Sequence, residues 1–380
     1  MVSQLSQLSQ ASQVVVGADV HKHSHTFVAV DETGKKLGQL TVRADSTGHD
    51  KAVRWAQAQF GAAGDSGDGC GDGCGDGCGA GIRWGIEDCR HLSARLEIDL
   101  LEAGQHVVRV PPKLMAEQRR TARTRGKSDP IDALAVARAV LREPDLPVAA
   151  HDEASRELKL LVDHRDDLVA QRTQVVNRFR WHLHRIDPTV DPAPASLNRA
   201  KTRRCMAELL ADRSGIDARL ARELLTDIET LTARVNTLKT EIAALVAVQA
   251  PALLELEGCG TLTAAKIVGE TAGITRFPHE AKYAMHAGVA PIPVWSGRTA
   301  GRVRVNRSGN RQLNAALHRI AVTQIRLGGL GKAYYDKRLA AGDSTTEALR
   351  CLKRRLARVV FNTLKNNPST ATATGLAAAA

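Results

Sequence analysis

The first part of the chain alternates short apolar runs with polar turns, the pattern of a sheet. Apolar runs stand at 14–16, 27–31 and 37–42, and the polar stretch 31–35 joins the second to the third. Asp, Thr and Gly in that stretch favour a tight reversal of the chain. We therefore expect a three-stranded antiparallel meander.

Beyond the meander, helical and strand patterns alternate. The expected elements are a helix at about 47–60, a strand at 82–87, a helix at 92–103, a strand at 107–110 and a helix from 129 onward. A meander followed by alternating helices and strands is the element order of an RNase H-like fold. The predicted fold class is therefore α/β for residues 14–145, followed by mainly α structure.

After a proline-bearing joint at 144–147, the apolar period becomes that of long helices. In 158–186, apolar residues recur every seven positions, and in 224–245 they alternate steps of four and three. The second seam consists of Leu224, Ile228, Leu231, Val235, Leu238, Ile242 and Leu245. Prolines 188, 192 and 194 separate the two helices. Residues 150–250 are thus expected to form an antiparallel hairpin or a coiled coil between subunits, with a buried bundle face as the alternative.

The last third, 251–366, is predicted to be mainly helical. An apolar helix ends in Gly258-Cys259-Gly260 and a new helix follows, which is typical of a helix-hairpin-helix that offers backbone N–H groups to a phosphate. Ordinary packing of two helices is the alternative. Residues 1–13 and 367–380 are expected to be disordered.

The net charge of the chain indicates what kind of molecule it binds. The 380 residues carry a formal net charge of +12, which favours a polyanion. Residues 281–335 contain nine Lys or Arg and no Asp or Glu, so we expect a phosphate-contacting surface there. Neither a signal peptide nor a membrane span is predicted, and the expected location is the bacterial cytoplasm, at the nucleoid during activity.

A Gly/Asp/Cys-rich insertion at about 61–81 interrupts the predicted α/β domain. It carries Cys70, Cys74 and Cys78 in a glycine-dominated repeat that offers no rigid frame for a metal. We interpret it as a looped-out insertion. The four other cysteines are scattered and are assigned no chemistry.

Four carboxylates are candidates for a two-metal site. Asp19 ends the first predicted strand, Glu87 ends the fourth, and Asp129 and Asp132 share one face of the first turn of a helix. Cleavage of a phosphodiester by two hard cations needs three or four such oxygen ligands. The alternative for the helical pair is a cap and a favourable first-turn charge. The neighbouring carboxylate Asp88 is the alternative to Glu87.

Three alternating histidines, His21, His23 and His25, are expected to share one face of a strand. No carboxylate or cysteine partner stands at a suitable spacing for zinc. A polar face that touches DNA is the favoured interpretation.

Two basic clusters are candidates for contact with the nucleic-acid backbone. The first comprises Arg119, Arg120, Arg123, Arg125 and Lys127, and the second comprises Arg298, Arg302, Arg304, Arg307 and Arg311. The first directly precedes Asp129, so it is expected at the rim of the metal site.

Four ordered motifs carry a family resemblance over residues 14–365. They are Gly17-Ala18-Asp19-Val20-His21-Lys22, Gly85-Ile86-Glu87-Asp88, Lys127-Ser128-Asp129-Pro130-Ile131-Asp132-Ala133, and Ala287-Gly288-Val289-Ala290-Pro291 leading to Ser296-Gly297 and Gly309-Asn310. In this order they resemble the DEDD transposases of the insertion sequence 110 type. The insertion before Glu87 departs from that pattern and would put Glu87 in doubt if it disturbed the strand.

The resemblance implies a site and partners that the residues alone do not reveal. Asp19, Glu87, Asp129 and Asp132 correspond to the metal-binding tetrad of a RuvC-like domain, which would hold two Mg²⁺ ions, or Mn²⁺. Ser296 corresponds to the nucleophile of a C-terminal transposase domain, which links covalently to DNA. The resemblance further implies a coiled-coil dimerisation element and a structured bridge RNA that pairs with donor and target DNA.

Several alternatives stay open. Without the resemblance, Ser296 reads as a turn residue, and Ser308 and Ser128 are competing serines. A serine hydroxyl needs activation, so the hypothesis is a composite site of tetrad and serine, with the serine from the same subunit or from another subunit of a dimer or tetramer. The competing functions are a metal-dependent hydrolytic Holliday-junction-type endonuclease and a non-enzymatic coiled-coil protein that binds nucleic acid.

Overall fold

The computed structural model forms two compact units, residues 1–151 and 152–380, which are described one at a time. The described residues are 14–61, 81–87, 92–121, 128–143, 146, 148–149, 152–299, 302–305 and 309–366. The predicted disordered ends and most of the Gly/Asp/Cys insertion lie outside these ranges.

Unit 1 is built on one five-stranded sheet with the order β3-β2-β1-β4-β5. Its strands are β1 (Val14–Val20), β2 (Ser24–Val30), β3 (Lys36–Arg43), β4 (Ile82–Glu87) and β5 (His106–Val110). The meander β1-β2-β3 is antiparallel, while β4 runs parallel to both β1 and β5. The predicted meander and the strands after it are confirmed, and this mixed sheet is compatible with an RNase H-like domain. Because β4 pairs on both sides, the insertion leaves the Glu87 strand intact.

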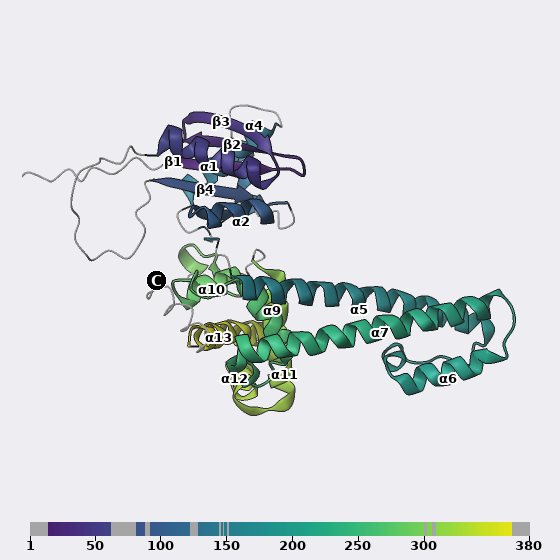
Figure 1. Ribbon diagram of the computed structural model, residues 1–380. Helices are drawn as coiled ribbons and strands as arrows, with labels where there is room; N and C mark the ends of the chain where they lie inside the picture. Colours follow the sequence, from purple (N-terminus) through teal and green to yellow (C-terminus); the bar gives the residue numbers. More distant parts are fainter. Residues whose placement is uncertain are drawn as a thin grey trace, which may run out of the picture. The chain divides into compact units, whose positions relative to one another are not determined.

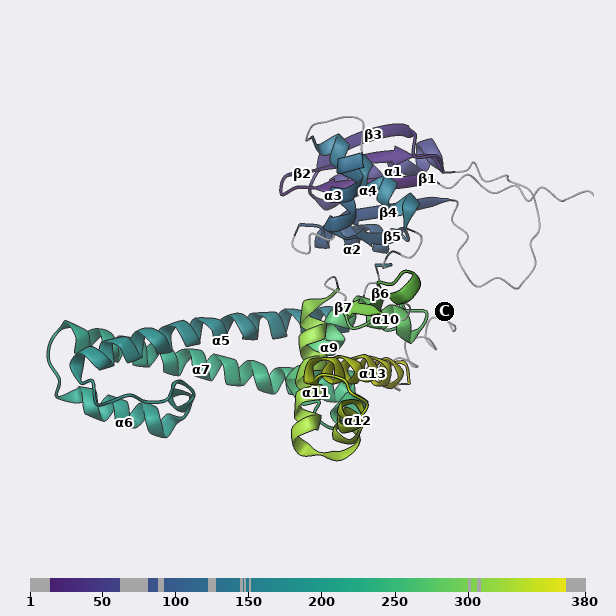
Figure 2. The same cartoon turned by 180° about the vertical axis from the view of Figure 1, so that it is seen from behind.

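Helices cover both faces of this sheet (Figures 1 and 2). The apolar core on one face contains α1 (Ser46–Phe60) and α2 (Ala94–Glu102), and the core on the other contains α3 (Pro112–Thr121) and α4 (Asp129–Arg142). Successive residues of β1 enter opposite cores, as the alternation of a strand requires. Helix α3 was not predicted, because its sequence is mostly polar and shows no regular apolar period.

Two glycines allow α4 to approach the sheet closely. Gly17 and Gly85 are register partners on β1 and β4. A Cβ added at Gly17 would lie 2.2 Å from the carbonyl oxygen of Ala133, and one at Gly85 would lie 2.5 Å from Val140. Side chains two residues farther along a strand share its face. Asp19 and Glu87 therefore stand on the face covered by α4.

We expect Gly17→Ala to destabilise unit 1 by about 1–3 kcal/mol or more, because the added methyl group overlaps the α4 backbone. Urea unfolding followed by circular dichroism measures this change. Gly38→Ala on β3 is the matched control, since its nearest neighbour is the tip of the Trp55 side chain, at 3.2 Å. Equal effects of the two substitutions would contradict the close-packing argument.

A long antiparallel helical hairpin dominates unit 2 (Figures 1 and 2). Helix α5 (Glu153–Ile186) packs along α7 (Ile216–Gln249), and His182 near the end of α5 lies 2.8 Å from Asp217 at the start of α7. The short helices η1 (Pro194–Asn198) and α6 (Ala200–Ala211) connect them. Of the two arrangements predicted for these helices, the structure shows the hairpin within one chain.

The buried stripe of α7 is displaced from the predicted seam. The buried positions are Ala218, Ala221, Leu225, Ile228, Thr232, Val235, Ile242 and Val246. Leu224, Leu231, Leu238 and Leu245 are only half-buried and form a flank at seven-residue spacing. Of the predicted seam, Ile228, Val235 and Ile242 are buried, whereas the four leucines lie at the side of the buried stripe.

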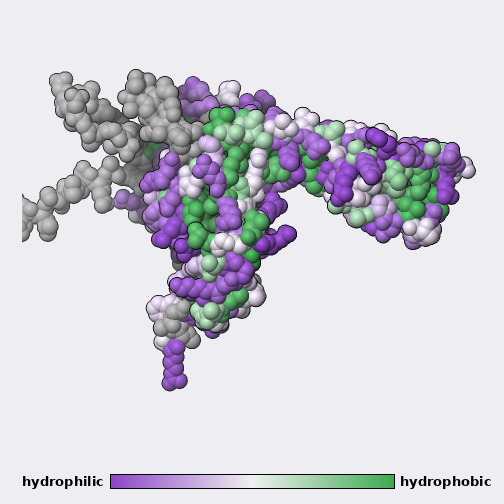
Figure 3. Space-filling model, turned by 90° about the horizontal axis from the view of Figure 1, so that it is seen from below, coloured by the Kyte–Doolittle hydropathy of each residue, from purple (hydrophilic) through white to green (hydrophobic). Residues whose placement is uncertain are grey.

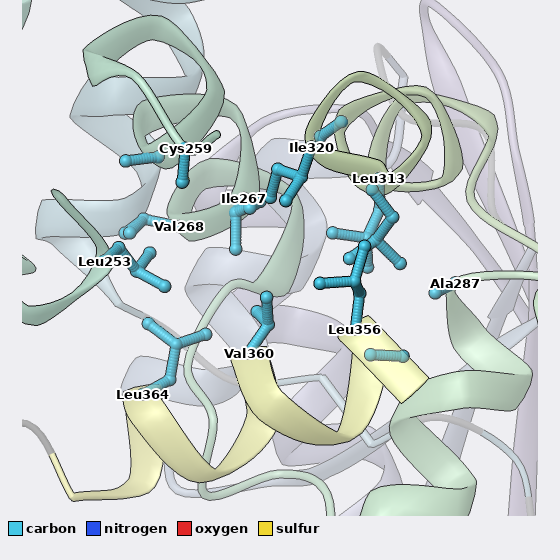
Figure 4. Packing of buried hydrophobic residues seen from close by; sticks show 14 of the residues in the cluster. Leu253, Cys259, Ile267, Val268, Ala287, Leu313, Ile320, Leu356, Val360 and Leu364 are labelled. Carbon is cyan, nitrogen blue, oxygen red and sulfur yellow. The ribbon is translucent and has the colours of Figure 1, made fainter. Parts of the chain in front are cut away.

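The remaining helices share a core with the near end of the hairpin. They are α8 (Pro251–Leu254), α9 (Thr261–Thr271), α10 (Glu280–His286), α11 (Arg311–Leu327), α12 (Gly329–Ala340) and α13 (Thr345–Lys365). Figure 4 shows side chains of α9, α11 and α13, among them Ile267, Ile320 and Val360, converging in this core.

In the Gly258-Cys259-Gly260 turn before α9, one glycine packs against another helix and the other does not. Gly258 has φ +82° and lies against α11, where Gln324 donates a hydrogen bond to the carbonyl oxygen of Glu257 at 2.8 Å. Gly260, by contrast, borders open space.

Large apolar side chains stand exposed at the corner between α11 and α12. Leu327 is 66% and Leu330 is 90% exposed. Seen from below in Figure 3, hydrophobic residues lie among hydrophilic ones over the C-terminal helices and near the tip of the hairpin. Among the described helices, none is long and apolar enough to cross a membrane.

Candidate active site

Asp19, His21 and Asp129 form a compact group at the end of β1. Nε2 of His21 lies 3.1 Å from Oδ2 of Asp19 and 3.3 Å from Oδ1 of Asp129. One ligand atom from each residue lies within 4.8 Å of the other two. The sheet supplies the first residue, the following turn supplies the second, and the first turn of α4 supplies the third. Residues distant in sequence thus meet at the carboxyl-terminal end of the central strand.

Asp132 and Glu87 flank this group without belonging to it. Asp132 lies one turn after Asp129 on α4 and is 4% exposed. Glu87 follows Ile86, whose register partner on β1 is Ala18, so Glu87 and Asp19 end neighbouring parallel strands. Both flanking carboxylates therefore approach the same edge of the sheet.

His21 is the residue of this group that the sequence interpretation did not place in the site. The predicted strand face of three histidines is wrong, because β1 ends at Val20 and β2 begins at Ser24. His21 and His23 lie in the turn, and only His25 lies in a strand. The signal that would have found His21 is its position two residues after the strand-end carboxylate.

His25 belongs to a separate buried cluster. Its ring stacks on His49 with centroids 5.0 Å apart, and Nδ1 of His49 lies 2.5 Å from Oδ2 of Asp99. Burial, helped by the nearby His49, lowers the pKa of His25 to about 4. His25 is therefore neutral at physiological pH and has a packing role, not the DNA-contacting role expected of it.

The electrostatics of Asp19 favour a cation. The residue is 3% exposed, and this burial raises the pKa of its carboxyl. His21 acts in the opposite direction, while Asp132 and Asp129 raise that pKa further. A buried carboxylate beside two others is destabilised by desolvation and by like charge. Carboxylate oxygens are also the ligands that Mg²⁺ and Mn²⁺ prefer, so these residues fit a divalent metal.

We expect Mg²⁺ or Mn²⁺ to raise the Tm of unit 1, because a cation offsets the repulsion among these carboxylates. At ten times Kd the stabilisation is about 1.4 kcal/mol. Differential scanning fluorimetry measures it, with NaCl at matched ionic strength as the control. The double variant Asp19→Asn/Asp129→Asn should show no such rise, and an equal rise in that variant would place the cation elsewhere.

Ser296 lies on a small β-hairpin in unit 2. The strands are β6 (Pro291–Pro293) and β7 (Val303–Val305), and Val294 extends the ladder by donating to the carbonyl oxygen of Arg302 at 3.0 Å. Ser296 is exposed in the loop between them. Next to it, Trp295 is 55% exposed and Gly297 has φ +47°. The serine is therefore accessible, with an aromatic ring beside it.

A glycine joint closes the base of this hairpin. Gly309 has φ +109°, and a Cβ added there would lie 2.7 Å from the backbone of Gly288. The Asn310 N–H donates to the carbonyl oxygen of His286 at 2.7 Å, and the Asn310 side chain caps α11. It also donates to Glu270, which Lys159 holds at 2.5 Å. The Ala287-Gly288 and Gly309-Asn310 motifs are therefore in contact, and this contact holds the two ends of the hairpin segment together.

The predicted basic contacts are only partly described. Arg298, Arg302, Arg304 and Arg311 are exposed on and near the Ser296 hairpin. Arg119 and Arg120 lie in α3, and their side chains are outside the described set. Arg123, Arg125, Lys127 and Arg307 lie outside the described residues.

Comparison with known proteins follows the same two regions. Residues 78–188, which include Glu87, Asp129 and Asp132, match a family model for DEDD transposases of the IS110 type. Residues 250–336, which include Ser296, match the model described as the transposase IS116/IS110/IS902 family.

Two relatives that cover nearly the whole chain, and a third that covers part of it, agree with these matches. The chain is 25% identical to the insertion element IS116 44.8 kDa protein of Streptomyces clavuligerus, over 93% of this chain and 95% of the relative. It is 26% identical to the insertion element IS900 42 kDa protein of Mycobacterium paratuberculosis, over 96% and 99%. It is 28% identical to the insertion element IS110 43.6 kDa protein of Streptomyces coelicolor, over 57% and 64%.

Proposed function

Because the chain belongs to the IS116/IS110/IS902 family of transposases and is a DNA transposase, we propose that it cuts and rejoins DNA through a phosphoserine at Ser296. Metal-binding carboxylates at Asp19, Glu87, Asp129 and Asp132 are the second half of this proposal. The observation that carries it is the meeting of Asp19 and Asp129 within 4.8 Å at the edge of an RNase H-compatible sheet.

The carboxylates position the reaction. Asp19 and Asp129 would hold the divalent metal, with Asp132 and Glu87 beside them. When bound, the metal supplies charge stabilisation for the phosphoryl oxygens and acidity for an attacking hydroxyl. The rigid ends of β1, β4 and α4 fix the ligand oxygens in advance, so little reorganisation is needed when DNA binds.

Ser296 supplies the covalent step. Its Oγ attacks phosphorus, an O–P bond forms, and the bond from phosphorus to a deoxyribose oxygen breaks. The serine loses its proton, and the displaced oxygen gains one. One phosphate ester replaces another, so the bond energy is retained for rejoining, whereas hydrolysis would lose it. A serine hydroxyl needs activation, and a divalent metal bound by the carboxylates would supply it.

Partners follow from charge and from the helical hairpin. Donor and target DNA, together with a bridge RNA, are the polyanions proposed for a chain of net charge +12. The half-buried leucines of α7 pack partly against this chain's own cores, and their remaining exposed surface supports association with a second copy, in a dimer or a tetramer. We place the reaction in the bacterial cytoplasm, at the nucleoid, where the substrate DNA lies.

A hydrolytic junction endonuclease is the second candidate, because the carboxylate group lies wholly within unit 1 and would suffice for hydrolysis. A denaturing gel separates the two functions, using purified protein, Mg²⁺, labelled element-junction DNA and the RNA encoded beside the element. Transposition through Ser296 gives a protease-sensitive covalent adduct. Free cleaved ends without any adduct would establish hydrolysis in its place.

A further inference from the structure

A cavity of about 560 Å³ lies at the base of the Ser296 hairpin, within unit 2. Its walls come from the Ala287–Pro291 segment, β7, the start of α11, α12 and α13. Ligand pockets in proteins span roughly 300–1,000 Å³, so this cavity has room for a nucleotide. It is distinct from the carboxylate group, which belongs to unit 1.

The cavity combines small apolar groups with cations. Val289, Ala290, Pro291, Val303 and Tyr334 provide apolar surface. Arg304, Arg311 and Arg350 line it too, and among the described residues they form no ion pair. Apolar surface beside guanidinium groups matches a base attached to a phosphate.

The two carboxylates on the wall already have partners. Asp343 lies 2.6 Å from Nε of Arg338, and Glu347 closes the capping box of α13 with Ser344. The pKa of Glu347 is lowered by Ser344 and also by Arg350, so Glu347 offsets part of the charge of Arg350 and leaves that of Arg304 and Arg311. The cavity keeps an excess of positive charge.

Lys353 adds to this excess. Its Nζ donates to Oδ1 of Asn314 at 2.9 Å, while Asn314 donates to the backbone carbonyls of Ala287 and Gly288. Burial, and then Arg350, lower the pKa of Lys353. An ammonium group held by a neutral amide and beside another cation is stabilised by an incoming anion.

The cavity also shares elements with the proposed nucleophile. Pro291 and Val303, which begin the two strands on either side of the Ser296 loop, stand in its wall. Gly288 and Gly309 line its floor and close the base of the hairpin. A strand held at Ser296 would therefore contact the same hairpin that forms part of the cavity wall.

We propose that this cavity receives one nucleotide of the single strand whose neighbouring phosphate reacts with Ser296, with Arg304, Arg311 and Arg350 binding its phosphate. This inference rests on the proposed function and adds a specificity pocket to it. The occupied cavity fixes the register of the strand against the serine loop.

Alkylation of Cys351 tests the proposal, because this half-buried cysteine lines the cavity. The protein carries Ser296→Ala and is kept without divalent metal, so that no chemistry occurs. A random single-stranded DNA hexanucleotide is added, and the iodoacetamide labelling rate at each cysteine is followed by peptide mass spectrometry. We expect at least a fivefold slower rate at Cys351 and no change at the exposed Cys205 on α6.

Paired variants supply the control. Arg311→Gln/Arg350→Gln should remove the protection, whereas Lys337→Gln/Lys365→Gln should keep it, since those lysines lie on α12 and α13 outside the cavity wall. An unchanged Cys351 rate under saturating hexanucleotide, shown by fluorescence anisotropy, would overturn the proposal. Protection by deoxynucleoside monophosphates but not by the hexanucleotide, or equal protection by a poly-glutamate peptide, would also overturn it.

The outcome is separable from that of the proposed function. A covalent adduct without Cys351 protection refutes the cavity alone. Protection without an adduct in wild-type protein refutes the phosphoserine alone.

Discussion

Ser296→Ala is expected to abolish the covalent protein–DNA adduct and to lower strand transfer by at least about 10³-fold, because alanine has no oxygen to form the ester. The denaturing gel with labelled junction DNA measures the adduct, and sequencing of joined products measures transfer. Ser308→Ala is the matched control, since Ser308 also precedes a glycine in the same basic stretch. It should leave the adduct in place.

The loss should not reflect unfolding. Ser296 is exposed in the loop between β6 and β7, and the hairpin is held at its base by the Gly288–Gly309 contact. Surface substitutions of this kind change stability by within about 0.5 kcal/mol. DNA binding by Ser296→Ala, measured by anisotropy, should equal that of the wild type. An adduct that survives the substitution would assign the nucleophile to another residue.

The α/β unit was largely predictable from the sequence because its strands bear strong local signals. Consecutive Val14, Val15 and Val16 and the turn around Gly34 define the meander, and Asp129 with Pro130 marks the start of α4. Asp19 and Glu87 then end neighbouring parallel strands by topology alone. His21 escaped prediction because its role depends on where β1 stops, and strand ends are poorly defined by local pattern.

The C-terminal part was less predictable because its site depends on contacts between distant residues. Strands of three residues, such as β6 and β7, leave no measurable alternation. The contact between Gly288 and Gly309 is a backbone approach across 21 positions, and no residue pattern announces it.

The helical hairpin shows the limit of periodicity. A seven-residue repeat identified α7 as a packed helix, but it did not predict which side of α7 packs against α5. Leu225 and Thr232 are buried where the prediction placed Leu224 and Leu231. Adjacent residues of a helix point about 100° apart. The buried side of α7 is therefore turned away from the side on which the predicted leucines lie.

Asp19→Asn is expected to lower cleavage by at least about 10³-fold while making the metal-free protein more stable. The amide is a poorer metal ligand and carries no charge, so the proposed site loses its most buried anionic ligand. A folded-state pKa raised above its unfolded value means that stability falls as the pH rises through the folded pKa. Neutral asparagine removes that loss, so the gain in Tm should appear near pH 7 and vanish at a pH below the ordinary range of aspartic acid.

These opposite effects separate a catalytic role from a structural one. Thermal unfolding without metal at pH 7 and at low pH gives the stability change, and the cleavage assay with Mg²⁺ gives the rate. Asp99→Asn is the matched control in the same unit: it should leave cleavage intact and lower Tm, because Asp99 holds the buried His49 at 2.5 Å. If Asp19→Asn lost both activity and stability, Asp19 would be a support of the fold, and the carboxylate group would not be the metal site.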